Sequence, residues 1–293
     1  MNNNTITQKD RKPKTSPKRR RFWLFAAISV VLIITAVFTA EIYRSNFVIT
    51  PANYTIDAPE IDHKVRIVQI SDLHNKSFGE NNEKLIAAVS EEKPNMIVLT
   101  GDIVDRYHDI DSQEEFLNAL LPQLVEIAPL YACIGNHEQA SIGEERYIEI
   151  LRGHGCVFLD NEYHDINLGG NEIRIGGLNY YRRWDEEKNA FMRDFCDTDR
   201  YTLLLCHFPE YHLWGLENYS IDLTLSGHTH GGLVRAPFVG GIYAPEQGMF
   251  PQYDKGYFED ENSTLIVSSG LASSPFFIPR FLNPAEYSVI DFS

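Results

Sequence analysis

The sequence predicts an α/β domain built on a parallel sheet and preceded by one membrane-spanning helix. Short uninterrupted apolar runs, such as Met96–Leu99, are typical of strands that are buried on both faces of a parallel sheet. In the first half of the chain these runs alternate with helical patterns, as expected for βαβ units. A chain of 293 residues is long enough for one such domain with a substantial core.

The N-terminal 40 residues predict a basic tail followed by a membrane anchor. Residues 1–21 are rich in Asn, Thr, Pro, Lys and Arg and lack apolar periodicity, so we expect a disordered tail. Residues 22–40 carry no charge, which fits the roughly 20 residues of a membrane-spanning helix. The basic cluster Lys18–Arg21 should keep the tail cytoplasmic under the positive-inside rule. The expected location is therefore the cell membrane, with a single pass and an extracytoplasmic body.

Cleavage of this helix is the alternative to an uncleaved signal anchor. A cleavage site before Glu41 needs small residues at positions −3 and −1, where Phe38 and Ala40 stand, so the pattern favours the anchor. The run Arg19-Arg20-Arg21-Phe22 also resembles a twin-arginine export signal, which serves folded proteins. The sequence leaves twin-arginine and Sec export open.

The body of the chain is strongly acidic. The formal net charge is −15, and because residues 1–40 contribute +7, residues 41–293 carry −22. An acidic surface repels polyanions, so we expect no nucleic-acid partner and disfavour a nuclease. A small phosphate-containing substrate stays compatible with this charge if cations occupy the site.

The four cysteines form no CxxC pair and no spacing typical of a zinc site. Cys133 and Cys206 fall inside apolar runs, and we expect them to be buried as small apolar side chains. Cys156 and Cys196 could pair in an oxidising compartment, although nothing in the sequence requires a disulfide.

After the anchor, residues 41–62 predict a linker that includes an edge strand near Tyr54–Ile56, and residues 63–293 predict one domain. Its first half should alternate three buried strands with three helices, each helix marked by an apolar stripe or a capping pattern. The strands are expected at Val65–Ile70, Met96–Leu99 and Leu130–Ile134, and the helices at Leu85–Val89, behind the capping box Ser112–Glu115, and from Ser141 and Glu144 to Leu151.

Past Val157 the pattern changes to strands with fewer helices. A hairpin is expected where two alternating segments flank Gly169-Gly170-Asn171. The segment 234–256 is rich in Gly, Pro and aromatic residues and is a candidate lid, with Tyr243 and Phe250 as substrate walls. The expected strands are Ile166–Leu168, Ile173–Ile175, Tyr201–Leu205, Ile221–Leu225, Leu265–Val267 and Tyr287–Ile290.

Five of the predicted strands end in polar clusters. Each cluster alone is compatible with a turn or a helix cap, but ligands collect at the carboxyl ends of strands in α/β sheets, so five clusters together indicate one site. Five other histidines, in polar or loop contexts, are expected to be solvated: His63, His108, His154, His164 and His212. The clusters are Asp72 with His74, Asp102, Asn136 with His137, His207, and His228 with His230.

The residue types in these clusters suit two divalent metal ions. Imidazole, carboxylate and amide oxygen without thiolate favour Mn, Fe or Zn in a site that is not a structural zinc site. Two ions about 3.5–4 Å apart need a bridging anionic group, and Asp102 stands alone at the end of its strand beside Gly101. Glycines next to the ligands allow the backbone to turn tightly, namely Gly101, Gly135, Gly227 and Gly231.

The clusters resemble the five motifs of the calcineurin-like metallophosphoesterase family, in the family's order, over about residues 65–232. The exported, membrane-anchored bacterial branch of that family shares stretches similar to Gly240–Pro245 and Arg280–Glu286. The resemblance implies a four-layer α-β-β-α sandwich, in which the strands after Val157 form the second sheet.

The resemblance also implies a role for each motif residue. Asp102 would bridge the two metal ions, and His137 would be the catalytic histidine beside them. Glu138 would either orient His137 or cap the following helix. Asp72, His74 and His230 would hold the first ion, and Asn136, His207 and His228 would hold the second.

The activity implied by the resemblance is metal-dependent hydrolysis of phosphate esters. We expect a phosphodiesterase in which a hydroxide that bridges two metal ions attacks phosphorus, with Mn favoured and Fe or Zn as alternatives. A phosphomonoesterase, a pyrophosphate-cleaving relative and a non-catalytic scaffold are the other hypotheses. The membrane helix suggests a lipid-linked or envelope phosphate as substrate. The apolar tip Phe276–Ile278 would either touch lipid or an apolar substrate, or form a hydrophobic plug under the loop of the site.

Overall fold

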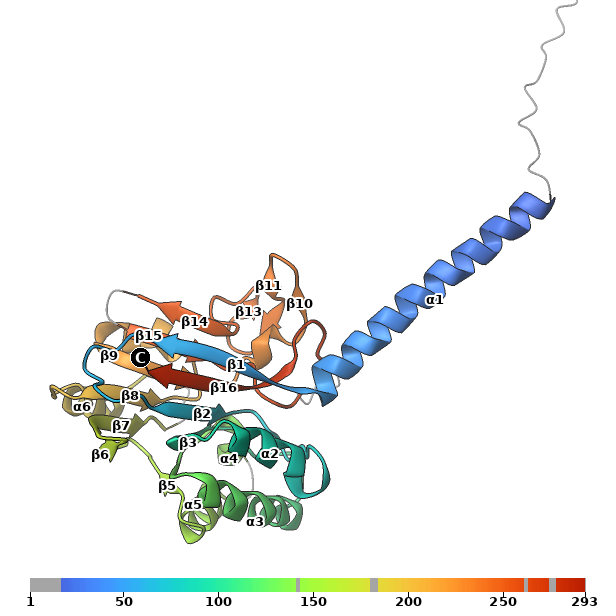
Figure 1. Cartoon of the computed structure of the whole chain (residues 1–293). Coiled ribbons are helices and arrows are strands. Elements are labelled where there is room, and N and C mark those ends of the chain that lie inside the picture. Colours follow the sequence, from blue (N-terminus) through green and yellow to red (C-terminus); the bar gives the residue numbers. More distant parts are fainter. Residues whose placement is uncertain (1–16, 141–142, 180–183, 261–262, 274–277, 293) are drawn as a thin grey trace, which may run out of the picture. The chain divides into compact units, whose positions relative to one another are not determined.

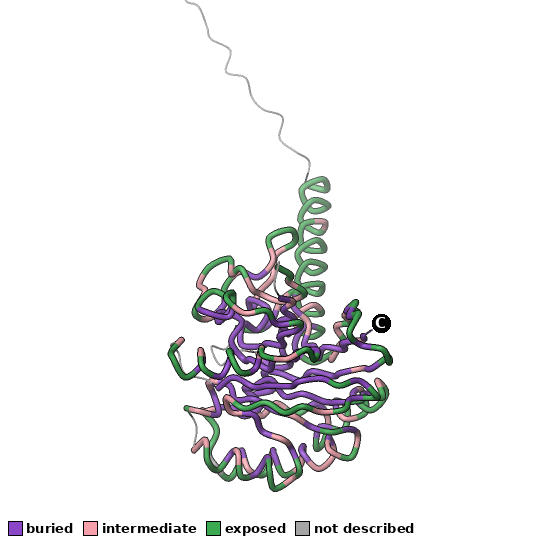
Figure 2. The backbone as a smooth tube through the Cα atoms, turned by 90° about the vertical axis from the view of Figure 1, so that its left-hand side faces the viewer, coloured by how far each residue is buried: buried purple, intermediate pink, exposed green. Residues whose placement is uncertain are grey.

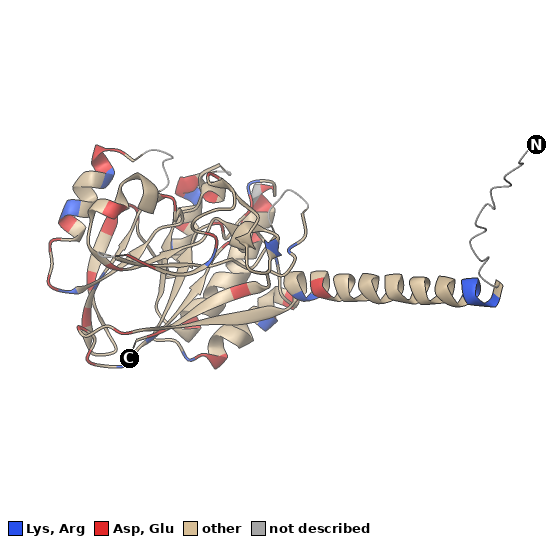
Figure 3. Cartoon of the chain, turned by 90° about the horizontal axis from the view of Figure 1, so that it is seen from above, with Lys and Arg blue, Asp and Glu red and all other residues tan. Residues whose placement is uncertain are grey.

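The structure, a computed structural model, describes residues 17–292 except 141–142, 180–183, 261–262 and 274–277, and it divides into two units. The first unit is Met1–Glu41, and its described part lies in helix α1 (Pro17–Phe47). By length and composition α1 could cross a membrane. Basic residues gather at its N-terminal end, and its middle carries no charge (Figure 3). The second unit, Ile42–Ser293, contains the last turn of α1 and an α/β domain.

Two six-stranded sheets form the centre of the second unit (Figure 1). In the first sheet four of the five strand pairings are parallel and one is antiparallel. In the second sheet the three central pairings are parallel and the two outermost pairings are antiparallel. The first sheet has the order β1 (Ile49–Ile56), β16 (Ala285–Phe292), β2 (Arg66–Ile70), β3 (Met96–Thr100), β4 (Leu130–Cys133) and β5 (Val157–Phe158). The second has the order β14 (Gly256–Glu259), β15 (Ser263–Val267), β9 (Ile221–Ser226), β8 (Tyr201–Leu205), β7 (Asn171–Gly177) and β6 (Glu162–Leu168).

Helices cover the outer faces of both sheets, which confirms the expected four-layer α-β-β-α sandwich. Helices α2 (Glu83–Glu91), α3 (Ile110–Ile127) and α5 (Glu144–Gly153) lie on the first sheet (Figure 1). Helix α6 (Glu186–Phe195) lies on the second, where Phe195 leaves no room for a side chain on Gly176. The strands run as buried segments between exposed helical surfaces (Figure 2). The shorter elements are α4 (Asn136–Ala140), α7 (Tyr211–Trp214), the 3-10 turns Glu80–Asn82, Leu216–Asn218 and His230–Gly232, and the hairpins β10–β11 (Arg235–Ala236, Gly240–Gly241) and β12–β13 (Tyr243–Ala244, Gly248–Met249).

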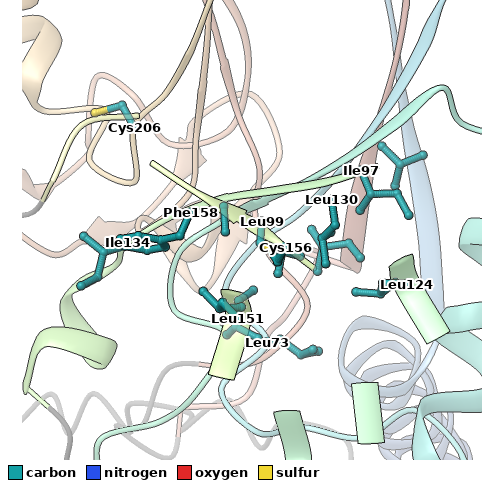
Figure 4. Close-up of a cluster of buried hydrophobic side chains, with 14 of the residues drawn as sticks. Leu73, Ile97, Leu99, Leu124, Leu130, Ile134, Leu151, Cys156, Phe158 and Cys206 are labelled. Atoms are coloured by element: carbon teal, nitrogen blue, oxygen red, sulfur yellow. The ribbon is translucent and has the colours of Figure 1, made fainter. Parts of the chain in front are cut away.

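Alternate side chains of each strand enter two different cores. Val98 of β3 and Leu203 of β8 pack between the sheets, whereas Leu99 of β3 packs under the helices. Figure 4 shows the core under the helices, where Leu99 and Leu130 of the sheet meet Leu124 and Leu151. Both faces of these strands are therefore apolar, and this burial explains why the sequence shows continuous apolar runs without alternation.

The cysteines and two helices complete the comparison with the expected elements. Cys133 and Cys206 are buried, as predicted, and Cys156 and Cys196 are free thiols that form no disulfide. Helix α3 begins earlier than the capping box predicted, because Asp109 accepts hydrogen bonds from the backbone N–H and hydroxyl of Ser112 at 2.9 and 3.0 Å. Helix α6 was not predicted, since half of its sequence is charged. The proposed cap Ser141 lies outside the described residues.

The last turn of α1 belongs to the α/β unit and is fastened by buried polar groups. Asn46 donates from Nδ2 to the carbonyl of Arg280 at 2.9 Å and accepts from the backbone N–H of Arg280 at 3.1 Å. The Arg280 side chain is itself fully buried. Its guanidinium donates to the carbonyls of Ser269, Ala272, Asn283 and Pro284.

We predict that Arg280→Met lowers the free energy of unfolding by on the order of 3 kcal/mol, because four buried carbonyls lose a charged donor. Chemical denaturation of the purified protein would measure the loss. Arg193→Met is the matched control, since this exposed guanidinium forms a salt bridge with the exposed Glu186 and its removal should cost less than about 1 kcal/mol. Equal losses in the two variants would contradict the structural role of Arg280.

Candidate metal centre

The polar clusters predicted at the strand ends come together at one edge of the sandwich. Main-chain hydrogen bonds join the loops that follow the strands: the N–H of Asp72 donates to the carbonyl of Gly101 at 3.1 Å, and that of Gly227 to the carbonyl of His207 at 3.0 Å. The first bond links the loops after β2 and β3, and the second links those after β8 and β9. The carboxyl ends of both sheets therefore present their side chains to a common space.

Three groups of side chains place ligand-type atoms close enough for a metal ion. Within each group the atoms lie within 4.8 Å of one another, and nearly all of the residues are buried. The groups are Asp72 with His74 and His230, Asp102 with His207 and His228, and His74 with Asp105 and His137. The histidines and aspartates that the sequence singled out thus meet at one centre, together with Asp105.

Asp102 lies at the middle of this centre. Its Oδ2 is 3.3 Å from Nε2 of His207, 3.8 Å from Nε2 of His74 and 4.0 Å from Nε2 of His137. Its Oδ1 accepts a hydrogen bond from the backbone N–H of His137 at 2.8 Å. One carboxylate oxygen therefore faces imidazoles from all three groups, and the other holds the start of α4.

The electrostatics of the centre favour an ionised Asp102. Burial alone would raise the pKa of Asp102, but the facing imidazoles of His207, His137 and His74 hold it well below the ordinary value. Burial also opposes a charge on His207, yet Asp102 raises the pKa of His207 to about 10. In the metal-free protein His207 therefore carries a proton at neutral pH.

His74, His228 and His230 are neutral at that pH. Burial is the largest cause that lowers the pKa of His74, His228 and His230. A neutral imidazole offers a lone pair to a metal ion without first losing a proton. These three histidines are thus ready to act as metal ligands.

Several buried polar atoms of the centre have no hydrogen-bond partner among the described residues. They include Oδ1 of Asn136, both ring nitrogens of His74 and Nε2 of His228. An unsatisfied buried polar atom costs roughly 1–3 kcal/mol, so such a concentration needs an explanation. His207 donates from Nδ1 toward the carbonyl of Thr100 at 2.7 Å, which directs Nε2 toward Asp102. Burial, donor chemistry and unpaired atoms together fit divalent metal ions.

The backbone is strained where it presents these side chains. Non-glycine residues rarely adopt a positive φ, and such residues gather at functional sites where the surrounding structure holds them. A Cβ on Gly135 would collide with Asp102, and one on Gly227 would collide with Ser71 and Asp72, so both glycines are needed for close approach. Positive φ angles occur at Asp72 (51°), His74 (48°), Asp102 (55°), His228 (70°) and His230 (50°).

Asp105 is a site residue that the sequence analysis missed. Its Oδ1 lies 3.1 Å from Nδ1 of His137, and both residues are largely buried. A carboxylate at one ring nitrogen fixes the tautomer of an imidazole and leaves the other nitrogen for chemistry. The available signal was its position three residues after Asp102, on the loop that approaches the start of α4.

Glu138 holds the loop that carries Asp102 and contacts the residue just before α4. Its carboxylate is fully buried and accepts hydrogen bonds from the backbone N–H groups of Asp102, Ile103 and Gly135 at 2.9, 2.6 and 2.9 Å. Burial and the neighbouring Asp102 raise the pKa of Glu138 to about 7. Glu138 therefore shapes the loop that carries Asp102.

The C-terminal stretch Arg280–Glu286 supports the loop that carries His230. Asn283 donates from Nδ2 to the carbonyl of His230 at 2.7 Å and to that of Leu233 at 3.0 Å. Its own backbone N–H donates to the hydroxyl of Ser45 at 3.3 Å. The last turn of α1 is thus connected to a ligand loop through one buried asparagine.

The five histidines that were expected to be solvated are mostly accessible to solvent, with one exception. His212 is buried on α7, and burial lowers its pKa to about 4. The exposed or half-exposed members are His63, His108, His154 and His164.

The candidate lid, residues 234–256, and the predicted apolar tip Phe276–Ile278 belong to loops in the C-terminal part of the chain. Residues 234–256 form the hairpins β10–β11 and β12–β13, on which Tyr243 and Phe250 are exposed. Their role as substrate walls stays a prediction. Phe276 and Phe277 lie outside the described residues, and Ile278 is exposed.

Comparisons with known proteins agree with the geometry of the site. Residues 65–232 match the model of the calcineurin-like phosphoesterase family. "Uncharacterized metallophosphoesterase YkuE" of Bacillus subtilis is 29% identical, over 84% of this chain and 86% of its own length. A metallophosphoesterase of Aquifex aeolicus is 28% identical, over 88% of this chain and 97% of its own. "Phosphodiesterase YaeI" of Escherichia coli is 30% identical, over 61% and 66%.

Among solved structures, TT1561 of Thermus thermophilus aligns with a TM-score of 0.46 and 12% identity, over 72% of this chain and 91% of that one. The family model covers more than half of this chain and spans every loop from Asp72 to His230. The chain belongs to the calcineurin-like phosphoesterase family, whose members hydrolyse phosphate esters with divalent metal ions.

Proposed function

We propose that this protein is a phosphodiesterase that uses two divalent metal ions. The observation that carries the proposal is the buried Oδ2 of Asp102, which faces imidazoles from more than one ligand group at 3.3–4.0 Å. The preference for diesters is supported by the relative named phosphodiesterase YaeI. Two bound cations would activate water and neutralise charge on the phosphoryl oxygens.

The ligand assignment follows the groups described above. Asp102 would contribute to both ions, because its Oδ2 lies 3.3 Å from Nε2 of His207 in one set and 3.8 Å from Nε2 of His74 in the other. Mn is proposed as the native metal, with Fe or Zn as alternatives, because the donors are imidazole, carboxylate and amide oxygen without thiolate. Asp72, His74 and His230 would hold one ion, and Asn136, His207 and His228 the other.

His137 is proposed as the catalytic residue. The Asp105 carboxylate at Nδ1 favours the ring form in which Nε2 faces the centre, 4.0 Å from Asp102. When protonated, this imidazole can donate a proton to the departing ester oxygen, and its charge favours the phosphoryl group. Asp105 acts through His137 by orienting its ring.

We also propose that α1 anchors the protein in the membrane and that the α/β unit lies outside the cytoplasm. The proposal is supported by the length and apolar composition of α1 and by the basic residues Lys18–Arg21 at its start. In that location a lipid-linked or envelope phosphate is the proposed substrate.

We predict that His137→Ala lowers kcat on bis(p-nitrophenyl) phosphate with added Mn²⁺ by about 10²–10⁴-fold, because the general acid is lost. Metal content, measured by elemental analysis, should stay at the wild-type value. His154→Ala, which alters a half-exposed histidine bonded to Asn118, should retain wild-type kcat. Wild-type turnover in His137→Ala, or in wild-type protein stripped with a chelator, would rule out the proposed function.

We predict that metal binding releases a proton from His207. Its pKa of about 10 in the metal-free protein means that a metal ion must displace this proton at pH 7.5, whereas His74, His228 and His230 are already neutral. Metal affinity should therefore rise with pH up to about 10 and fall as pH decreases. Calorimetric titration with Mn²⁺ in two buffers of different ionisation enthalpy should show release of about one proton. The absence of any proton release would contradict the assignment of His207 as a ligand.

A further inference from the structure

The hairpin β10–β11 carries an apolar tip that has no place in the catalytic centre. The side chain of Phe238 at this tip is fully exposed, with a relative exposure of 109%, and Val239 beside it is 56% exposed. The ten residues Ala236–Pro245 contain no charge, although 23% of the whole chain is charged. The tip is therefore an apolar projection on an otherwise acidic protein.

The backbone conformation at this tip makes a phenylalanine unexpected if the residue contacts only water. Phe238 has a φ of 67°, in the left-handed region that bulky residues rarely occupy and that Gly or Asn would adopt at lower cost. A phenylalanine in this position accepts backbone strain and still leaves its ring outside the protein core. Burial of such a ring in an apolar medium would be favourable.

Other exposed apolar side chains lie on or beside the two hairpins, on segment 278–282 and on the last turn of α1, and we call this set of residues the apolar rim. Hydrogen bonds show that its parts are neighbours: the N–H of Arg235, on β10, donates to the carbonyl of Phe281 at 3.0 Å, and the N–H of Asn283 donates to Ser45. The segment 280–283 thus lies between the hairpin and the last turn of α1. The apolar rim consists of Tyr43, Phe47, Val48, Phe238, Val239, Tyr243, Met249, Phe250, Ile278 and Leu282, each at least 38% exposed.

The position of the apolar rim along the chain indicates which partner it contacts. One residue, Glu41, separates the uncharged stretch 22–40 from Ile42, where the α/β unit begins, so the rim starts within a few residues of the apolar span. Aromatic side chains are enriched where proteins cross the boundary between water and lipid, and five of the ten rim residues are Phe or Tyr. The rim thus continues the apolar character of α1 onto the domain itself.

We propose that the apolar rim inserts into the lipid bilayer at the boundary between headgroups and acyl chains, a proposal that rests on α1 spanning the membrane. The rim is tied to the metal centre, because Asp254 accepts from the N–H of Gly241 at 2.7 Å and its carbonyl accepts from the Thr229 hydroxyl. Thr229 lies between His228 and His230. Insertion of the rim would hold these ligand loops at the membrane surface, where the substrate class is a phosphate ester of an amphiphile.

The test uses the full-length protein in nanodiscs of phosphatidylethanolamine and phosphatidylglycerol. Phe238→Cys is labelled with an environment-sensitive fluorophore, in a background in which the half-exposed Cys196 is replaced by Ser and the other three cysteines are buried. Glu172→Cys, on the exposed side of β7, is the matched control. We expect a blue-shifted emission at position 238 and its loss when lipids with a nitroxide near the headgroup are included, with no change at position 172.

Equal behaviour of the two labels, both accessible to a water-soluble quencher, would overturn the proposal. Protection of position 238 that follows protein concentration and ignores the lipid nitroxide would assign the rim to a second copy of the chain and would also overturn it. The readout does not depend on catalysis. If lipid quenching is found while the diester is not hydrolysed, the proposed phosphodiesterase activity fails and the membrane contact stands.

Discussion

The buried carboxylate of Asp102, enclosed by imidazoles, is the interaction on which the rest of the structure depends. A carboxylate in the protein interior is unfavourable unless cations or hydrogen-bond donors compensate it. Here His207, His74 and His137 approach one oxygen, while the backbone N–H of His137 satisfies the other. These partners come from both sheets, so the two halves of the sandwich must meet at this edge for Asp102 to be stabilised. The same arrangement makes the centre suitable for metal ions, because it concentrates negative charge and neutral imidazole in one place.

The support for this centre extends well beyond the ligands. Glu138 gathers the backbone N–H groups of the Asp102 loop, and Asn283 holds the carbonyl of His230. Asn283 also contacts Ser45, so the ligand loop is connected through hydrogen bonds to the last turn of α1. Five residues of the centre adopt a strained backbone conformation with a positive φ, and this conformation persists because the surrounding contacts hold it in place. The last turn of α1 and the α/β unit are consequently parts of one hydrogen-bonded structure from Ile42 onward.

The sequence predicted the central strands and the polar clusters that follow them, because both have strong local signals. Continuous apolar runs marked β2, β3, β4, β8 and β9, and each ended in a residue type that binds metal. Asp105 was missed because its role depends on the spatial approach of its loop to His137, and its position three residues after Asp102 is only a weak signal of that contact. Helix α6 was missed because its packing uses only a few apolar residues. The function of Glu138 depends on contacts with four separate backbone N–H groups. Tertiary contacts decided each of these features.

The central claim is that Asp102 contributes to both metal ions, and the metal content of Asp102→Asn tests it most directly. The amide has the same shape but no charge, so it cannot supply the anionic bridge that two closely spaced cations require. Elemental analysis after equilibration with Mn²⁺ should find two ions in the wild-type protein and in Asp109→Asn, a carboxylate change at an exposed helix cap, but one ion or none in Asp102→Asn. Retention of both ions in Asp102→Asn with wild-type affinity would contradict the account.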